Sequence, residues 1–159
     1  MTRFGVTHFR VTHFRALLLC GVVLAASACA SKRSRDPEFL TPYGAPVNPF
    51  SPAVRVGDML YLAGQIGTDS TGAVVKGGIE AETRQTMRNI ADVLQKTGST
   101  MDRVVKCTAF LADMKEWPAM NGVYATFFPR NKPARSAFGA TGLALNARVE
   151  IECIAVVSN

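Results

Sequence analysis

The segment at residues 147–157 constrains the fold more than any other part of this 159-residue chain. Apolar side chains alternate there with charged ones: Val149, Ile151, Cys153 and Ala155 fall on one side, Arg148, Glu150 and Glu152 on the other. Because successive side chains of a β-strand point to opposite faces, the pattern predicts a strand with one buried and one charged face. Such a strand belongs to a sheet that other elements cover on one face.

Two further strands and a helix are predicted upstream. Apolar runs at 54–56 and 59–63 flank a Gly-Asp pair, which is typical of a β-hairpin. From residue 79 to residue 94, apolar side chains recur at helical spacing. The folded body is therefore expected to begin with a hairpin and continue into an amphipathic helix.

A strand and a second helix follow. Residues 104–112 are apolar and rich in β-branched side chains, which favours a strand. Asp113 and Glu116 offer an N-cap and a capping-box partner for a helix over 117–128, which Pro129 ends. The resulting order of strands and helices predicts an α+β domain, in which two helices pack on one face of a mixed sheet.

The positive charge of the chain is concentrated at its start. The net charge is +6, but residues 1–35 hold six basic residues and no acidic one, so the remainder carries twelve of each sign. A formally neutral body has no basic surface for tracking phosphates. We therefore expect no nucleic acid among the partners of the body.

The first thirty residues have the three-part plan of a secretory signal. A basic segment ends at Arg15, an apolar run covers 16–26, and small residues follow. The apolar run is shorter than the roughly 20 residues that cross a bilayer as a helix. Residues 1–30 are interpreted as a signal peptide, 31–47 as a linker, and 48–159 as the folded domain, which would be exported.

Cys29 gives the signal a second possible meaning. It follows Ala26-Ser27-Ala28, which resembles the box of bacterial lipoproteins, in which the cysteine is acylated and becomes the new N-terminus. Lipidation at Cys29 is the favoured interpretation, and the lipid anchor would be the only link to a membrane. Ordinary cleavage after Ala28 or Ala30, or an uncleaved leader, are the alternatives.

The body has few residues for metal or nucleophile chemistry. Both histidines, His8 and His13, lie in the leader, so the body can build neither a Ser-His-Asp triad nor an imidazole zinc site. Its two cysteines, Cys107 and Cys153, lie in apolar strand patterns, where buried free thiols are common. In an oxidising compartment they could also pair. We favour free thiols, and expect neither a metal nor a cofactor.

Two charged residues are candidates for ligand chemistry. Arg135 follows Pro133 at the point where the chain re-enters the sheet, and its guanidinium could clamp a carboxylate with two hydrogen bonds. Glu150 shares a strand face with Glu152 and could act as a general acid or base. An ordinary ion pair for Arg135 and a solvated strand face for Glu150 are the alternative interpretations.

The sequence around these residues resembles the RidA/YjgF family of enamine and imine deaminases. The resemblance covers 48–157, and motifs occur in the same order as in the family. They are Asn48-Pro-Phe-Ser, Gly57-Asp-Met-Leu-Tyr-Leu-Ala-Gly-Gln-Ile66, Asn89-Ile, Asn121-Gly-Val-Tyr-Ala-Thr-Phe-Phe128, Pro133-Ala-Arg-Ser and Val149-Glu-Ile-Glu-Cys-Ile-Ala-Val156.

The resemblance implies a fold, an assembly and a reaction. The fold would be chorismate-mutase-like, and three subunits would form a homotrimer with ligand clefts between neighbours. The reaction would be hydrolysis of 2-enamine or 2-imine acids to 2-keto acids and ammonia, without a cofactor. Arg135 would hold the substrate carboxylate and Glu150 would orient or deprotonate the attacking water. The implied substrate-binding positions are Phe50, Ala63, Gly64, Asn121 and Ala137.

Several of these positions depart from the family pattern. Phe50 stands where deaminating members usually have tyrosine, Ala63 replaces a frequent serine, and Ala137 replaces a frequent cysteine. Each change makes the pocket less polar, so we expect a bulkier or more apolar substrate. The alternative function is a non-catalytic trimer in the cell envelope that binds a small carboxylated metabolite through Arg135.

Overall fold

The computed structural model describes residue 1 and residues 35–157. The predicted signal peptide, its cleavage sites and the lipidation site Cys29 lie outside the described residues. Within the described part, no helix is both long enough and apolar enough to cross a membrane.

Within residues 35–157 the strands form one mixed, seven-stranded sheet. The strand order is β1-β2-β3-β7-β5-β6, and β4 pairs with β7 beside this path. β5 and β6 run parallel, whereas the other pairs are antiparallel. The strands are β1 Glu38–Leu40, β2 Ala53–Val56, β3 Met59–Leu62, β4 Gln65–Ile66, β5 Val104–Leu111, β6 Ala134–Gly139 and β7 Val149–Val156. The predicted mixed sheet is confirmed.

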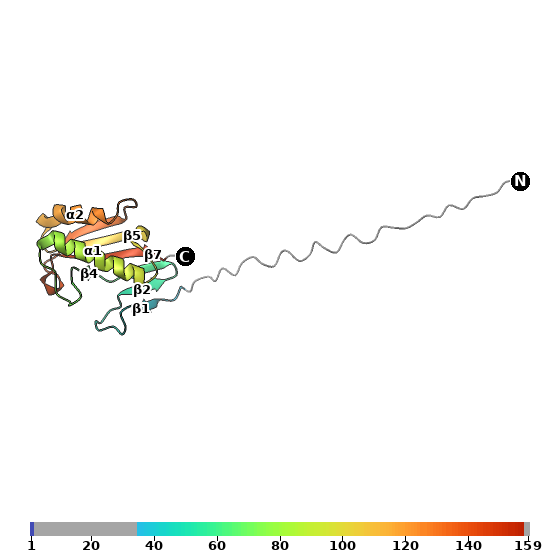
Figure 1. Ribbon diagram of the computed structural model, residues 1–159, viewed down its shortest axis with the longest axis horizontal. Helices are drawn as coiled ribbons and strands as arrows, with labels where there is room; N and C mark the ends of the chain where they lie inside the picture. The colour runs from blue at the N-terminus through green and yellow to red at the C-terminus, as the bar shows by residue number, and fades with distance from the viewer. Residues whose placement is uncertain (2–34, 158–159) are drawn as a thin grey trace. The chain divides into compact units, whose positions relative to one another are not determined.

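Two α-helices lie on the same side of this sheet (Figure 1). They are α1, Gly78–Lys96, and α2, Trp117–Thr126. Short 3₁₀ turns at Met101–Arg103, Met114–Glu116 and Ala144–Asn146 connect elements. Helix α1 ends where Gly98 adopts a φ of +84°, which glycine tolerates, and Ser99 N donates to Leu94 O at 2.8 Å. Both predicted helices are confirmed.

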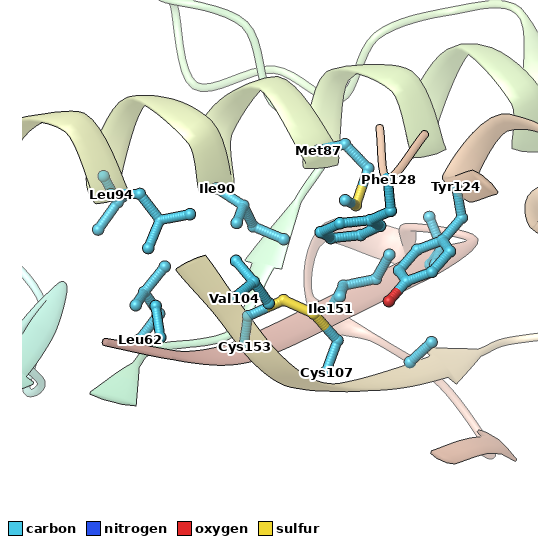
Figure 2. Packing of buried hydrophobic residues seen from close by; sticks show 14 of the residues in the cluster. Leu62, Met87, Ile90, Leu94, Val104, Cys107, Tyr124, Phe128, Ile151 and Cys153 are labelled. Atoms are coloured by element: carbon cyan, nitrogen blue, oxygen red, sulfur yellow. A yellow bond between two sulfur atoms is a disulfide. The ribbon is translucent and has the colours of Figure 1, made fainter. Parts of the chain in front are cut away.

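The core fills the space between the sheet and the two helices (Figure 2). The apolar side chains of β7 point into it as predicted: Val149, Ile151, Cys153 and Ala155 are all buried. Met87, Ile90 and Leu94 meet them from α1, and α2 contributes Met120 and Tyr124. Burying a large apolar side chain contributes about 1.5–3 kcal/mol, so this layer accounts for much of the stability and holds β5 and β7 rigidly under α1.

The opposite face of the sheet is not covered by the described residues. Large apolar side chains are exposed there, including Phe39 (68%), Tyr61 (45%) and Phe138 (54%). Phe138 packs against Phe110 of β5 with ring centroids 6.4 Å apart. Glu150 and Glu152 point to this face too, because they alternate with the buried side chains of β7. We call this surface the open face.

Part of the predicted linker, 31–47, belongs to the sheet instead. Residues 38–40 form β1, which pairs antiparallel with β2. The Tyr43 hydroxyl then donates to Asp92 of α1 at 2.7 Å. Three residues are too few to show a period, and the surrounding Pro and Gly suggested a loop, so the strand was missed. Strands β4 and β6 were also absent from the predicted order.

The predicted capping box does not form. Asp113 does accept a hydrogen bond, from Lys115 N at 2.9 Å, but it caps the 3₁₀ turn that precedes α2. Glu116 turns away and pairs with the side chain of Arg148, whose backbone N–H donates to the buried Glu82 at 2.7 Å. Glu116 therefore links the start of α2 to the start of β7, which a local sequence pattern cannot reveal.

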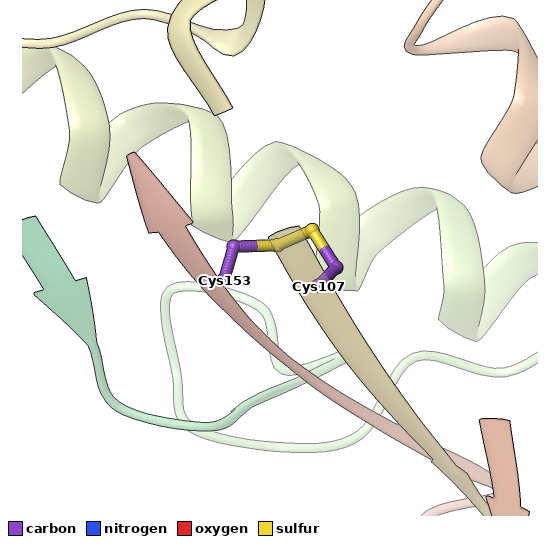
Figure 3. The surroundings of a disulfide bond; sticks show 2 residues. All are labelled: Cys107 and Cys153. Carbon is purple, nitrogen blue, oxygen red and sulfur yellow. A yellow bond between two sulfur atoms is a disulfide. The ribbon is translucent and has the colours of Figure 1, made fainter. Parts of the chain in front are cut away.

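The two body cysteines form a disulfide, which corrects the expectation of free thiols (Figure 3). Burial was predicted correctly, since Cys107 and Cys153 are each 1% exposed. However, the two residues lie directly opposite each other on β5 and β7, with Cα atoms 4.1 Å apart. Both side chains point toward α1, so the sulfur atoms meet under the helix. The sequence could not show this register.

Candidate functional site

Arg135 lies on β6 and points toward the helix layer. Arg135 is the strand partner of Cys107 of β5, whose side chain is in the core. Ala137, two positions further along β6, packs against the same core. Because every second side chain of a strand shares a face, Arg135 and Ala137 both point to the side of α1 and α2. Arg135 thus enters the sheet where the sequence predicted.

Three side chains of α2 contact the guanidinium of Arg135. Arg135 Nη2 donates to Asn121 Oδ1 at 2.8 Å. The guanidinium carbon lies 4.6 Å from the ring centroid of Tyr124 and 5.7 Å from that of Trp117. Both distances are within the range of cation–π attraction. None of the ion pairs found among the described residues includes Arg135.

A cavity of about 300 Å³ opens beside this arginine. It is lined by Asn121, Tyr124, Ala125, Phe128, Lys132, Pro133 and Arg135. Burial raises the pKa of Tyr124 to about 12, although the positive charge of Arg135 acts in the opposite direction. At neutral pH Tyr124 is therefore uncharged. The two charged side chains that line the cavity, Lys132 and Arg135, are both cations.

Glu150 lies on the other face of the sheet. In β7 it is flanked by the buried residues Val149 and Ile151, so its side chain points to the open face. The carboxylate packs against the backbone of Gly64: a Cβ on Gly64 would lie 2.0 Å from Glu150 Oε1. Only a glycine leaves room for the carboxylate at this position.

Two further predicted residues are connected to Gly64. Ala63 precedes Gly64, and its backbone N–H donates to Pro52 O at 3.0 Å. This bond ties the segment that carries Phe50 to the end of β3. Phe50 is 53% exposed.

The predicted site residues therefore form two groups. We call Arg135, Asn121 and Ala137, with Trp117 and Tyr124, the arginine half-site. We call Glu150, Gly64, Ala63 and Phe50 the glutamate half-site. Arg135 and Glu150 lie on opposite faces of the sheet, and β5 separates the strands that carry them. A single chain does not bring the two charged groups together.

The sequence placed Trp117 and Tyr124 in the second predicted helix, 117–128, but their contact with Arg135 was missed. A signal was available, because Trp117, Asn121 and Tyr124 are spaced by four and three residues and so share one helix face. Lys132, another cavity residue, carried no such signal. Among residues 35–157, no group of three or more His, Cys, Asp or Glu side chains is arranged to hold a metal ion.

The chain is similar to proteins of known sequence over most of the described part. A family model described as endoribonuclease L-PSP matches residues 42–157. The mouse 2-iminobutanoate/2-iminopropanoate deaminase is 41% identical over 113 residues, which cover 70% of this chain and 84% of the mouse protein.

Solved structures share the fold. A Yersinia pestis protein of unknown function from the conserved Rid protein family is 36% identical, with a TM-score of 0.71, over 77% of this chain and 100% of that one. Escherichia coli TdcF with bound serine is 27% identical, with a TM-score of 0.67, over 71% of this chain and 91% of that one. The predicted α+β architecture is thus found in these relatives too.

Proposed function

The chain belongs to the RidA/YjgF family, to which the endoribonuclease L-PSP model also corresponds, and from that premise we propose that it is an imine and enamine deaminase. Its substrates would be 2-imino and 2-enamino acids, and its products 2-keto acids and ammonia. The neutral charge of the body argues against a ribonucleic acid substrate. Relatives at about 40% identity named as deaminases support the proposal.

The state of Arg135 is the observation that carries this proposal. Within residues 35–157 its guanidinium makes one hydrogen bond, to a neutral amide oxygen, and it stands at the wall of an open cavity. A guanidinium has five N–H donors, so donors are left for a ligand carboxylate. A half-buried cation with no carboxylate partner among the described residues is suited to receive one from outside.

We place the complete site between two copies of the chain. The half-sites face away from each other in one subunit, so Arg135 of one copy would meet Glu150 of a neighbour. The open face exposes several large apolar side chains, as expected of a surface that another subunit covers. A closed homotrimer would cover the open face of every copy and would form three equivalent clefts.

The reaction would need only placement and proton transfer. Arg135 would hold the substrate carboxylate, and the neighbour's Glu150 would take a proton from water as its oxygen adds to the imine carbon. That proton would pass to the nitrogen. The hydroxyl of the resulting carbinolamine would then give its proton to the nitrogen as the C–N bond breaks, so ammonia would leave and the carbonyl of the keto acid would form. An enamine would first be protonated at carbon to give the imine.

The apolar residues of the glutamate half-site indicate which substrate side chains the cleft accepts. Phe50 and Ala63 lack the hydroxyl groups that are usual at these positions in the family, so substrates with larger apolar side chains are expected. An activity series that rises from alanine-derived to leucine- or phenylalanine-derived imines would support this. A preference for the smallest imine would contradict it.

The first experiment measures ammonia and keto acid release from imines generated in situ by an amino-acid oxidase. Arg135→Ala should abolish the acceleration without changing the oligomeric state. Arg130→Ala is the matched control, because Arg130 is an exposed arginine that pairs with Asp102 at the surface. Full activity of Arg135→Ala would remove this residue from the mechanism.

Subunit complementation tests the shared cleft. Arg135→Ala and Glu150→Gln should each be inactive alone. When they are co-expressed, random assembly gives about one cleft in four with both groups intact, so about a quarter of wild-type activity should return. If no activity returns although mixed trimers form, both groups must come from the same chain.

We propose further that the protein works in the cell envelope, as a lipoprotein anchored through Cys29. The leader supports this location, and a disulfide between two core strands fits an oxidising compartment. Cys29→Ser should move the protein from the membrane fraction to the soluble envelope fraction. If Cys29→Ser stays in the membrane fraction, the lipoprotein interpretation is contradicted.

A binding protein is the alternative function. The reduced polarity of Phe50, Ala63 and Ala137 favours it, because a ligand could be held at Arg135 without being hydrolysed. Saturable binding of a keto acid together with no acceleration of imine hydrolysis, over a range of side chains, would identify a ligand-binding trimer.

A further inference from the structure

Arg135 is held in an unusual way for a half-buried cation. Its neighbours on α2 are one amide and two aromatic rings, whereas arginines at protein surfaces commonly pair with acids, as Arg130 and Arg148 do in this chain. The distances of 4.6 Å to Tyr124 and 5.7 Å to Trp117 bring both rings within reach of the guanidinium. The arginine is therefore positioned without being neutralised.

A ring and a carboxylate hold a guanidinium by different parts. A ring attracts the cation through its π-electrons and uses none of the N–H donors when it stacks on the guanidinium face. A carboxylate takes the donors in the guanidinium plane, often two at once. Rings can thus fix the guanidinium and leave the donors for a ligand, which an ion pair cannot do.

We propose that Trp117 and Tyr124 are positioning residues for Arg135: their rings hold its guanidinium so that its in-plane donors receive the carboxylate of the ligand. This inference rests on the function proposed above. It assigns the two rings a role in ligand affinity, in addition to their packing in helix α2.

The packing of α2 makes the rings suitable for this role. Tyr124 is buried, and its ring lies against that of Phe128 with centroids 4.9 Å apart, so its position is fixed by the core (Figure 2). Trp117 stands seven residues earlier on the same helix face. A carboxylate bound at Arg135 would lie close to the indole, and Trp117 is the only tryptophan of the chain.

The test separates the ring from the rest of each side chain. Trp117→Met keeps apolar volume without a π-system, whereas Trp117→Phe keeps a ring. At the other position, Tyr124→Leu removes the ring and Tyr124→Phe removes only the hydroxyl, which has no hydrogen-bond partner among the described residues. The probe is 2-oxobutanoate, with butanone as the matched ligand that lacks a carboxylate.

Calorimetric titration of the full chain should give a clear order of affinities. Trp117→Met and Tyr124→Leu should each raise the Kd for 2-oxobutanoate about tenfold. Trp117→Phe should stay within about threefold of wild type, and Tyr124→Phe should match it. In the wild type, 2-oxobutanoate should also change the emission of Trp117, and butanone should not.

Kinetics add a readout that a packing defect would not give. The ring-removing variants should raise KM for the imine and leave kcat nearly unchanged, because the carboxylate contact is made in both the ground state and the transition state. Each comparison is made at a temperature where circular dichroism shows the variant folded. If Tyr124→Leu does not fold, the Trp117 pair alone decides.

Three results would overturn the inference. They are wild-type affinity in Trp117→Met, equal losses in Trp117→Met and Trp117→Phe, and no saturable binding of 2-oxobutanoate by the wild type. Failure of the proposed function looks different. In that case the wild type binds the keto acid, the variants follow the predicted order, and no imine hydrolysis is accelerated.

Discussion

The two half-sites hold their charged residues by opposite means. Arg135 is surrounded by side chains, and a cavity of about 300 Å³ remains beside it. Glu150 is packed against bare backbone, where the missing side chain of Gly64 provides the space that its carboxylate fills. One group stands at an open pocket, and the other lies in a close-fitting slot.

This difference matches what each group is proposed to do. A cation that captures a carboxylate needs free donors and room for the ligand. A base that handles one water molecule needs a fixed position more than it needs space. The two half-sites should therefore respond differently to substitution: changes near Arg135 should alter affinity, and changes near Glu150 should alter turnover.

The largest effect is expected from the disulfide, which joins the strands that both half-sites depend on. Cys107→Ala/Cys153→Ala should lower the free energy of unfolding by about 4 kcal/mol, given a sequence separation of 46 residues. Urea unfolding of both proteins measures it. Equal stability would mean that the core alone maintains the pairing of β5 and β7.

Gly64→Ala should damage the glutamate half-site alone. The new Cβ would stand 2.0 Å from Glu150 Oε1, so the carboxylate must move, and kcat should fall about a hundredfold. The Kd for 2-oxobutanoate should stay near the wild-type value. Gly122→Ala is the control, because a Cβ there meets nothing within 4 Å. A large loss of affinity in Gly64→Ala would show that the half-sites are not separable.

High pH should test the arginine half-site through Tyr124. Burial raises its pKa from 10.0 to about 12, so in this interval the folded protein keeps a proton that the unfolded chain loses. Unfolding then releases a proton, and the free energy of unfolding falls as pH rises, by up to about 2 kcal/mol. In Tyr124→Phe, the decrease in the free energy of unfolding that comes from this proton should be absent. If the free energy of unfolding of wild type and of Tyr124→Phe fell equally between pH 10 and 12, the Tyr124 hydroxyl would be more solvated than its burial indicates.

Asn121→Asp should give the smallest of the four effects. The new carboxylate would pair with Arg135 at the present hydrogen-bonding position and compete with the ligand. The Kd for 2-oxobutanoate should rise about tenfold, and kcat should change less. Calorimetry measures the first and steady-state kinetics the second. A tighter Kd would mean that the ligand does not use the donors of Arg135.

The sequence predicted the layers of the fold well because periodicity reports burial. The alternation in 149–155 identified the inward side of β7, and the helical spacing in 79–94 identified α1. Pairing between distant segments was not accessible. The disulfide depends on Cys107 and Cys153 being directly opposite each other on two paired strands, and the pattern of one strand does not show its register with another.

The same limit applies to the site. The residue types and spacing around Arg135 and Glu150 indicated chemistry, and Asn121, one of the substrate-binding positions that the family resemblance implied, lies beside the arginine. However, the face of the sheet to which each charged side chain points depends on how the strands are paired, and the sequence does not give that pairing. The bare-backbone slot at Gly64 and the ring contacts of Trp117 are consequences of tertiary packing, so they became visible only in the folded chain.

Because the disulfide is buried, the redox state of its two cysteines is fixed at the time the chain folds. Each cysteine is 1% exposed under α1, so a soluble oxidant or reductant reaches the sulfur atoms only when this part of the fold opens. A chain that folds before export would seal in two thiols, and a chain that folds afterwards would seal in the bond. The redox state of the purified protein therefore reports the compartment in which α1 closed, as long as the fold has not opened since.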